Sequence, residues 1–302
     1  MTDPVLRSAA VAGALADGRP VVALETSVIG QGLPPPRGVE CIERMNAAIA
    51  AHDALPAWIG VVGGRVTVGL TPEELQLFTE PDRSVKVARR DLPVAVATGA
   101  LGATTVSATI WAAYRAGIAV AATGGIGGVH PRSGDVSADL LELARTPVLL
   151  VCSGPKSIVD PLATAERLEE LGVVLVGYRT DRLPFFLAAE SEVELEHQAS
   201  SPEEAAGVAR ALGGLEVRSA VVLCNPVPAE HAMDATEVAA AARACEERAA
   251  REGVRGKDVT PFLLACMAER TFGASLEANL ALLESNAGLA AEVAVALANA
   301  TT

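Results

Sequence analysis

The 302-residue sequence predicts an α/β fold: a three-layer α/β/α arrangement with a mostly parallel central sheet and a helical C-terminal portion. Short apolar runs alternate along the chain with longer helical patterns, which is typical of repeated β-α-β units. The runs are nearly continuous in apolar residues, as expected for strands that are covered on both faces. Half of the residues are hydrophobic but only 3% are aromatic, which predicts an aliphatic core.

Six apolar runs are predicted to be strands: residues 20–25, 93–98, 118–123, 147–152, 173–178 and 220–225. Four segments have helical patterns: residues 104–116, 137–146, 160–171 and 203–212. The chain is mainly helical after about residue 235. Gly63-Gly64 lies between two β-rich runs and predicts a hairpin. No linker, repeat or shift in composition divides the chain, so we expect a single domain spanning residues 1–302.

Two helix starts have the sequence of a capping box. Thr71 precedes Glu74 and Ser201 precedes Glu204, each pair with a proline directly after the hydroxyl residue. In a capping box the hydroxyl and the carboxylate each accept a hydrogen bond from the other residue's backbone N–H. We therefore expect a helix to begin at each of these positions.

Charge and cysteine content restrict the class of protein. The formal net charge of −13 argues against sequence-independent binding to nucleic acid or to an anionic membrane. The five cysteines form no C-x-x-C pair and no zinc spacing, so we expect separate thiols in a reducing cytoplasm. The broken apolar run at the N-terminus predicts a helix rather than a signal peptide. The uncharged stretch 92–114 contains Pro93, Gly99 and Gly102, which favours a strand, a turn and a helix over a membrane span.

Polar residues directly follow several of the predicted strands: Glu25, Thr123, the segment from Ser153 to Lys156, and Asn225. The carboxyl ends of parallel strands share one edge of a sheet, where ligands usually bind, so these residues are candidates for a site. Glu25 either exchanges protons in catalysis or holds backbone amides of the next loop. Lys156 is either an exposed loop lysine or a partly desolvated amine that attacks a carbonyl.

The run ATGGIGGVH places four glycines within residues 124–128. The run does not match G-x-G-x-x-G when the motif is started at Gly124 or at Gly125, because Ile126 or His130 then occupies a position that needs glycine. The chain also has no phosphate-loop motif. The run is therefore either a tight loop without a ligand or a place where backbone N–H groups approach an anion.

Three charged or hydroxyl residues allow two interpretations each. Ser137 is either the N-cap of the next helix or a ligand for a phosphate. Asp139 is either a carboxylate that suits the first helical turn or a ligand for a hard metal ion. Lys86 lies close to Arg89 and Arg90, and this cluster is either solvated or in contact with a phosphate.

Longer motifs occur in a fixed order along the chain. They are LETSVIGQGLP, KVARRDL, GATTVSAT, ATGGIGGVH, DVSADL, CSGPKSIVD, GYRTDRLPFF, NPVP, GKDVTPFLLA and SLEANLALLESNA. Together, from about residue 5 to residue 298, they resemble the pseudouridine-5′-phosphate glycosidase family, which includes the indigoidine-synthase-A-like proteins. The resemblance implies a cytoplasmic homotrimer with an α/β/α core. It also implies reversible cleavage of the C–C glycosidic bond of pseudouridine 5′-phosphate, giving uracil and ribose 5-phosphate.

The same resemblance assigns roles to individual residues. Lys156 matches the lysine that forms a Schiff base with the sugar, and Glu25 matches the residue that moves protons. Asp139 matches a ligand of a divalent metal ion, typically manganese, whose remaining ligands are waters. Contacts with the substrate are expected from Lys86, Thr105, Thr123, His130, Ser137 and Asn279. An iminium on the lysine suits this reaction, because a carbon leaving group needs an electron sink.

The chain departs from the family pattern in three places close to these residues, one of which is ATGALGATT, without the polar residues often seen before the glycine. Gly30-Gln31 stands where a small residue followed by His is common, and the segment between His130 and Asp139 is a few residues shorter than usual. Two alternative functions stay open at this point. One is a Schiff-base lyase acting on another sugar phosphate or C-nucleotide, and the other is a catalytically silent protein that binds a sugar phosphate.

Overall fold

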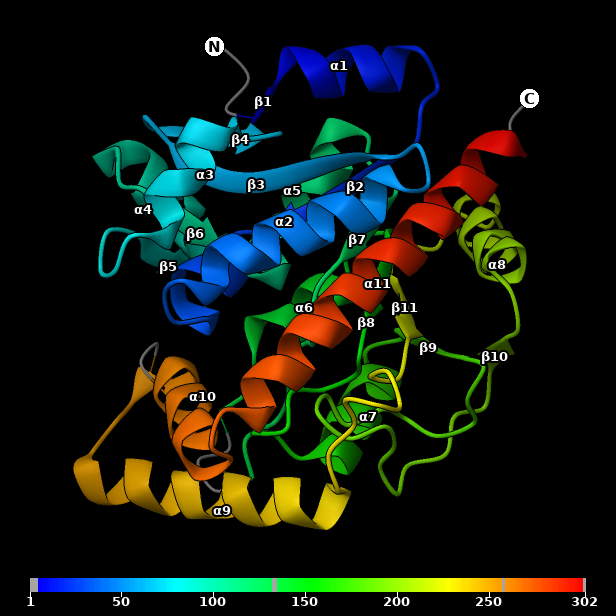
Figure 1. Cartoon of the computed structure of the whole chain (residues 1–302). Coiled ribbons are helices and arrows are strands. Elements are labelled where there is room, and N and C mark those ends of the chain that lie inside the picture. The colour runs from blue at the N-terminus through cyan, green and yellow to red at the C-terminus, as the bar shows by residue number, and fades with distance from the viewer. Residues whose placement is uncertain (1–4, 132–134, 257–258, 301–302) are drawn as a thin grey trace.

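The computed structural model describes residues 5–131, 135–256 and 259–300, and its described strands join in one sheet (Figure 1). The strands are β1 (Val5–Arg7), β2 (Val21–Glu25), β3 (Leu55–Val62), β4 (Arg65–Val68), β5 (Val85–Val87), β6 (Gly102–Thr104), β7 (Val120–Ala122), β8 (Leu149–Cys152), β9 (Val174–Tyr178), β10 (Gln198–Ala199) and β11 (Val221–Cys224). Their order is β1-β4-β3-β2-β7-β8-β11-β9-β10, with β6 on β3 and β5 on β6. From β3 to β10 all neighbours in this order pair in parallel, whereas β4 and β6 run antiparallel to β3.

Helices cover both faces of this sheet. They are α1 (Ala9–Ala16), α2 (Arg37–Ala50), α3 (Pro72–Thr79), α4 (Leu92–Thr98), α5 (Val106–Ala116), α6 (Ala138–Leu143), α7 (Pro161–Glu170), α8 (Pro202–Gly214), α9 (Ala235–Glu252), α10 (Val259–Arg270) and α11 (Ala274–Asn299). Two short helical turns, η1 (Val28–Gly32) and η2 (Arg89–Asp91), complete the described elements. The α/β fold with a mostly parallel sheet and a helical C-terminal portion is therefore confirmed.

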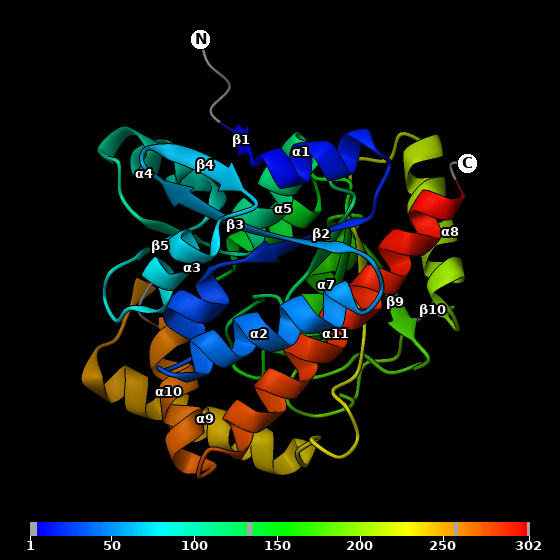
Figure 2. The same cartoon turned by 45° about the horizontal axis from the view of Figure 1, so that its top comes forward.

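Strand β2 shows why the structure has three layers. Its residues alternate between two separate hydrophobic clusters: Val22 and Leu24 pack with α2 and α11, whereas Val21 and Ala23 pack with α1 and α5. Successive side chains of a strand point to opposite faces, so a strand that is apolar throughout needs a cover on each face. Figures 1 and 2 show α2 and α11 crossing one face together, with α5 behind the sheet.

The prediction of a strand at residues 93–98 is wrong, because this segment is helix α4. The three-residue turn η2 precedes it, and Asp91 accepts a hydrogen bond from the backbone N–H of Ala88 at 3.0 Å. Pro93 lies in the first turn, where a helix needs no N–H donor, and Gly99 ends the helix with φ of 65°. The apolar run does not mark a buried strand, since Val94 is 64% exposed.

Of the two predicted capping boxes, one is confirmed and the other differs in one bond. At α3 both reciprocal bonds between Thr71 and Glu74 are present. At α8 the hydroxyl of Ser201 accepts from the N–H of Glu204, but the carboxylate of Glu204 accepts from the N–H of Ser200 instead. The side chain still satisfies a backbone donor at the helix start, one residue earlier than predicted.

The prediction of five separate thiols is wrong for one pair. Cys245 of α9 and Cys266 of α10 form a disulfide that joins these neighbouring helices. Cys41, Cys152 and Cys224 are free and buried, as predicted. No local spacing announces the disulfide, because the two cysteines are 21 residues apart and meet only when α9 packs on α10.

Among the described residues, helix α11 is long and apolar enough to cross a membrane by length and composition. In the fold its most apolar window is 61% buried, and the helix lies across the sheet beside α2 (Figure 1). Its composition is explained by this position in the core, where a helix is apolar over most of its surface. The uncharged stretch 92–114 forms α4, β6 and most of α5.

Candidate active site

One cavity of about 220 Å³ collects the nine residues to which the resemblance assigns roles, whereas the other candidates Arg89, Ser153 and Asn225 do not line it. Its lining includes Glu25, Lys86, Thr105, Thr123, His130, Ser137, Asp139, Lys156 and Asn279. The sheet explains why residues so distant in sequence meet. Strands β2, β7 and β8 are parallel neighbours, so the residues at their carboxyl ends arrive at the same edge.

Glu25 is the last residue of β2 and is buried, with 3% of its surface exposed. Its carboxylate accepts hydrogen bonds from the hydroxyls of Ser27, at 2.6 Å, and Thr123. Burial raises the pKa of Glu25 above its ordinary value, and the positive charge of Lys156 and the two hydroxyls lower it in part. A carboxyl group with a raised pKa inside a cavity is suited to donating a proton near neutral pH.

The glycine run forms a backbone ladder with the segment that leads to Lys156. Ser153 N–H donates to the Gly124 carbonyl at 2.8 Å, Ile126 N–H to Gly154 at 3.1 Å, and Lys156 N–H to Ile126 at 2.9 Å. These bonds fix the backbone on which Lys156 stands. The run is thus more than a loop that wraps a ligand, although Gly124, Gly125 and Gly127 also line the cavity.

Lack of space, rather than backbone conformation, explains the glycines of this run. A Cβ atom on Gly125 would lie 2.7 Å from the ring of Phe186, and one on Gly127 would lie 2.3 Å from the hydroxyl of Ser137. Contacts below 3.0 Å force something to shift. The glycines therefore allow the backbone to lie close to the side chains of Phe186 and Ser137.

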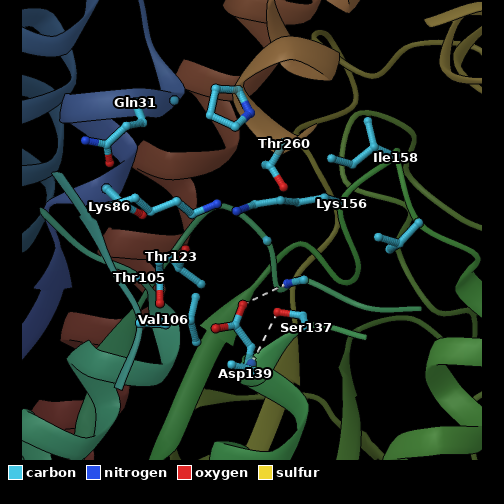
Figure 3. A pocket seen from close by; sticks show the side chains of 18 of the residues that line it. Gln31, Lys86, Thr105, Val106, Thr123, Ser137, Asp139, Lys156, Ile158 and Thr260 are labelled. Atoms are coloured by element: carbon cyan, nitrogen blue, oxygen red, sulfur yellow. Dashed lines mark hydrogen bonds between the residues drawn. The ribbon is translucent and has the colours of Figure 1, made fainter. Parts of the chain in front are cut away.

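Two lysines point into the cavity from opposite walls. Figure 3 shows the side chains of Lys86, from β5, and Lys156 extending toward each other, with Thr260 of α10 next to Lys156. The basic cluster around Lys86 divides. Arg90 also lines the cavity, whereas Arg89 donates to both carboxylate oxygens of the buried Glu142, at 2.8 and 2.6 Å.

Ser137 and Asp139 combine structural bonds with a place in the cavity wall. The hydroxyl of Ser137 caps α6 by accepting from Asp139 N–H at 3.2 Å. The carboxylate of Asp139 accepts from the N–H groups of Ser107, at 3.0 Å, and Gly127, at 3.1 Å. It thereby ties the start of α5 to the glycine run, and each oxygen retains capacity for another ligand.

The remaining predicted residues come from three other segments. Thr105 is the N-cap residue of α5 and contacts Ser107 through its hydroxyl at 3.0 Å. Asn279 lies on α11 with 8% of its surface exposed. Burial lowers the pKa of His130, and Lys86 lowers it further while Asp135 raises it. Residues 132–134 of the shortened segment lie outside the described residues.

The cavity also contains residues that the sequence did not single out. They include Ser27, Asp135, Phe186 and Thr260, and Gln31, which the sequence marked only as a departure from the family pattern, lines it too. Ser27 stands two positions after Glu25, which was the one available signal for its contact. Phe186 has φ of 55°, unusual for a bulky residue, and such strain often lies at functional sites. The sequence gives no sign of it, because the conformation depends on the ladder that its N–H joins at Ser153, at 2.8 Å.

Comparison with known proteins places this site in a family. The family model described as indigoidine synthase A like protein matches residues 10–296. The chain belongs to the indigoidine synthase A-like family. The resemblance inferred from the sequence motifs is therefore confirmed.

Curated relatives of this family member have one name in common. A pseudouridine-5′-phosphate glycosidase of Symbiobacterium thermophilum is 46% identical over 94% of each chain. One of Herpetosiphon aurantiacus is 48% identical over 95% of this chain and 96% of its own.

Solved structures give the same fold. A prealnumycin C-glycosynthase in complex with ribulose 5-phosphate is 38% identical, with a TM-score of 0.90 over 98% of each chain. An indigoidine synthase A-like protein of Thermotoga maritima is also 38% identical, with a TM-score of 0.90 over 97% of this chain.

Replacing Glu25 tests the effect of its burial on stability. Because its pKa is raised in the folded state, folding is favoured while Glu25 is protonated, and this contribution is lost as the pH rises through the folded pKa. We expect Glu25→Gln, which cannot ionise, to be more stable than the wild type at about pH 8, by about 1.4 kcal/mol for each unit of pKa elevation. The advantage should vanish below the ordinary pKa of 4.5.

Urea unfolding at about pH 8 and below pH 4.5 measures the difference in stability between Glu25→Gln and the wild type. Glu166→Gln, at an exposed position of α7, is the matched control and should show no pH-dependent gain. A gain of Glu25→Gln that is equal at both pH values would contradict the assignment, because it would then arise from packing rather than from ionisation.

Proposed function

We propose that this chain is a cytoplasmic pseudouridine-5′-phosphate glycosidase that cleaves the C–C glycosidic bond to give uracil and ribose 5-phosphate. One observation carries the proposal: a buried carboxyl group with raised pKa, Glu25, and a lysine, Lys156, line the same cavity. The curated relatives with this name support the choice of substrate. A sugar 5-phosphate in a solved relative supports the choice of ligand class.

The first step opens the sugar ring. The amine of Lys156 attacks C1′ of the ribose, and the C1′–O4′ bond breaks while Glu25 donates a proton to O4′. The new C1′–N bond places a nitrogen lone pair next to the bond that must break. Since the backbone of Lys156 is held by the glycine ladder, the amine approaches from a fixed direction.

The second step breaks the carbon–carbon bond. A proton delivered to C5 of the base leaves that ring cationic, and the electrons of the C1′–C5 bond return to it as neutral uracil departs. The lysine nitrogen lone pair forms the C1′=N iminium, which is the electron sink. Water then adds to C1′ and releases ribose 5-phosphate and the free amine. Glu25 recovers its proton between steps, which suits a carboxyl group whose pKa is raised by burial.

The phosphate of the substrate needs positively charged side chains around it, because the chain as a whole has a net charge of −13. Lys86 and Arg90 supply them from one wall of the cavity, and the hydroxyl of Ser137 adds a donor from the facing loop. Lys86 extends toward Lys156 in Figure 3, so a phosphate on Lys86 leaves the sugar between the two lysines. Thr105, Thr123, His130 and Asn279 surround this space and are assigned to the ribose and the base.

We also propose a divalent cation, manganese, on Asp139. Carboxylate oxygen suits a hard cation, and both oxygens of Asp139 retain acceptor capacity after their backbone bonds. No group of three ligating side chains occurs among the described residues, so the fit is to a cation that keeps most of its water. When bound, such an ion neutralises negative charge on the phosphate or sugar oxygens.

Uracil release tests the function directly. We expect the wild-type chain to release uracil from pseudouridine 5′-phosphate in the presence of Mn²⁺, detected by chromatography. Borohydride reduction with ribose 5-phosphate should attach the sugar to Lys156, seen as a mass increase on its peptide. Lys156→Ala should abolish both signals, with Arg90→Ala as a control that weakens phosphate binding but still traps sugar.

Other outcomes separate the competing functions. Sugar trapping without uracil release would favour a Schiff-base enzyme acting on another C-nucleotide, and the solved C-glycosynthase relative makes this the second candidate. Binding of ribose 5-phosphate without trapping would identify a silent sugar-phosphate-binding protein. Trapping that persists in Lys156→Ala would contradict the choice of nucleophile.

Removal of the Asp139 carboxylate tests the metal proposal without using activity. We expect Asp139→Asn to weaken Mn²⁺ binding by more than about tenfold, the scale on which even outer partners of a metal act. The electron paramagnetic resonance signal of free Mn²⁺ measures this in a titration. Asp135→Asn, in the same cavity wall, is the matched control. If Asp135→Asn weakens binding and Asp139→Asn does not, the cation is on Asp135.

The proposed trimer is supported by apolar side chains that face outward close to the site. Val136 and Leu141 are each 45% exposed and Leu162 is 49% exposed, and such side chains are typical of interfaces between subunits. We expect light scattering to give three times the chain mass of 30.8 kDa. Leu141→Asp should lower this mass, whereas a mass of one chain for the wild type would rule the trimer out.

A further inference from the structure

Asn286 is a fully buried polar residue in the apolar interior of α11. Its side-chain amide donates to the Thr123 carbonyl at 2.9 Å and to the Ser153 hydroxyl at 3.1 Å. Its carbonyl oxygen accepts from the side-chain amide of Asn225 at 2.9 Å. The residue is absent from the cavity lining, so it does not touch a substrate there.

The amide of Asn286 also lies 3.4 Å from the Gly124 carbonyl, and all three of its acceptors belong to the segments that place the reacting side chains. Thr123 directly follows β7, and its hydroxyl donates to the carboxylate of Glu25. Ser153 directly follows β8 and begins the segment that ends at Lys156. A single side chain from the helical layer therefore links the backbone beside Glu25 to the backbone below Lys156.

Packing alone does not explain an amide at this position. Neighbouring core positions of α11, such as Leu283, Ala287 and Ala290, are apolar and serve the contact with the sheet. A buried amide is costly unless its donors and acceptor are satisfied, and here both N–H groups and the oxygen have partners. Replacement by an apolar residue would leave the Thr123 carbonyl and the Ser153 hydroxyl short of partners.

We propose that Asn286 is a positioning residue that sets the placement of Lys156 relative to Glu25. The inference rests on the proposed function for the reaction that it serves. Asn286 acts through Thr123 and Ser153, and not on the substrate. The phosphate contacts from Lys86 and Ser137 come from segments that Asn286 does not touch.

The experiment compares turnover with substrate affinity in Asn286→Ala and Asn286→Asp. Asp has the shape of Asn but replaces both N–H donors, so it sets a carboxylate against the Thr123 carbonyl. We expect kcat for uracil release to fall by about tenfold to a hundredfold in both variants, because a small displacement of reacting groups has this effect. KM and the Kd for ribose 5-phosphate should stay within about threefold, since the phosphate contacts are intact.

Ser285→Ala is the matched control on the same helix. Ser285 also accepts from Asn225, at 3.0 Å, but contacts neither catalytic segment. It should keep kcat within about threefold of the wild type. If Asn286 served stability alone, its variants would lose melting temperature while the folded fraction kept the wild-type kcat, and that result would overturn the proposal.

Hydrogen exchange separates this inference from the proposed function. We expect faster exchange of the Ile126 and Lys156 amides, which form the ladder, in Asn286→Ala than in Ser285→Ala. Unchanged exchange and unchanged kcat would each contradict the positioning role.

If the wild type releases no uracil, the proposed function fails, and sugar trapping together with exchange still decides the role of Asn286. Should both Asn286 variants fail to fold, Ser153→Ala breaks the same link and should lower kcat with KM retained.

Discussion

The site depends on a backbone ladder between two chain segments that leave neighbouring parallel strands. The glycine run after β7 and the segment from Ser153 to Lys156 after β8 continue the pairing of their strands beyond the sheet edge. The backbone hydrogen bonds of this ladder fix the position of the Lys156 backbone. A loop without such bonds would leave that position undetermined. The ladder leaves little room for side chains. The ring of Phe186 and the hydroxyl of Ser137 lie so close to it that only glycine fits at Gly125 and Gly127.

Burial of polar groups at this edge of the sheet raises the pKa of Glu25 and also means that these groups need hydrogen-bond partners within the protein. Glu25 has a raised pKa because the sheet and the helices exclude water from it. The same exclusion means that every N–H, hydroxyl and carbonyl nearby needs a partner within the protein. Thr123 and Ser27 meet that need at Glu25, and Asn286 meets it below the ladder. An apolar α11 would cover the sheet equally well but would leave these groups without partners.

Features that depend on periodicity and on local chemistry could be predicted from the sequence. Strand β2, the Gly63-Gly64 hairpin and the Thr71 cap depend on nearby residues, and each is present as predicted. Glu25, Thr123 and Lys156 meet in one cavity because they follow neighbouring parallel strands, whose carboxyl ends share one edge of the sheet.

The helix at residues 93–98 and features that depend on distant packing were missed. The run at 93–98 is apolar but starts with proline after a tight turn, and exposure of Val94 is compatible with a surface helix. Cys245 meets Cys266 only through the packing of α9 on α10. Asn286 has the sequence context of a surface residue, because nothing local reveals which face of α11 lies over the strand ends.

In the proposed mechanism, catalysis and choice of substrate depend on different parts of the cavity wall. The steps at C1′ need only an amine, a proton donor and a leaving carbon that accepts a proton, so they are the same for any such base. In the proposed mechanism Glu25 and Lys156 at the sheet edge supply those groups, and in our proposal the ladder and Asn286 hold them there. Gln31 and Thr260 line the cavity from η1 and α10, outside the strand ends that hold the reacting groups. The relative named as a C-glycosynthase has this same fold, with a TM-score of 0.90.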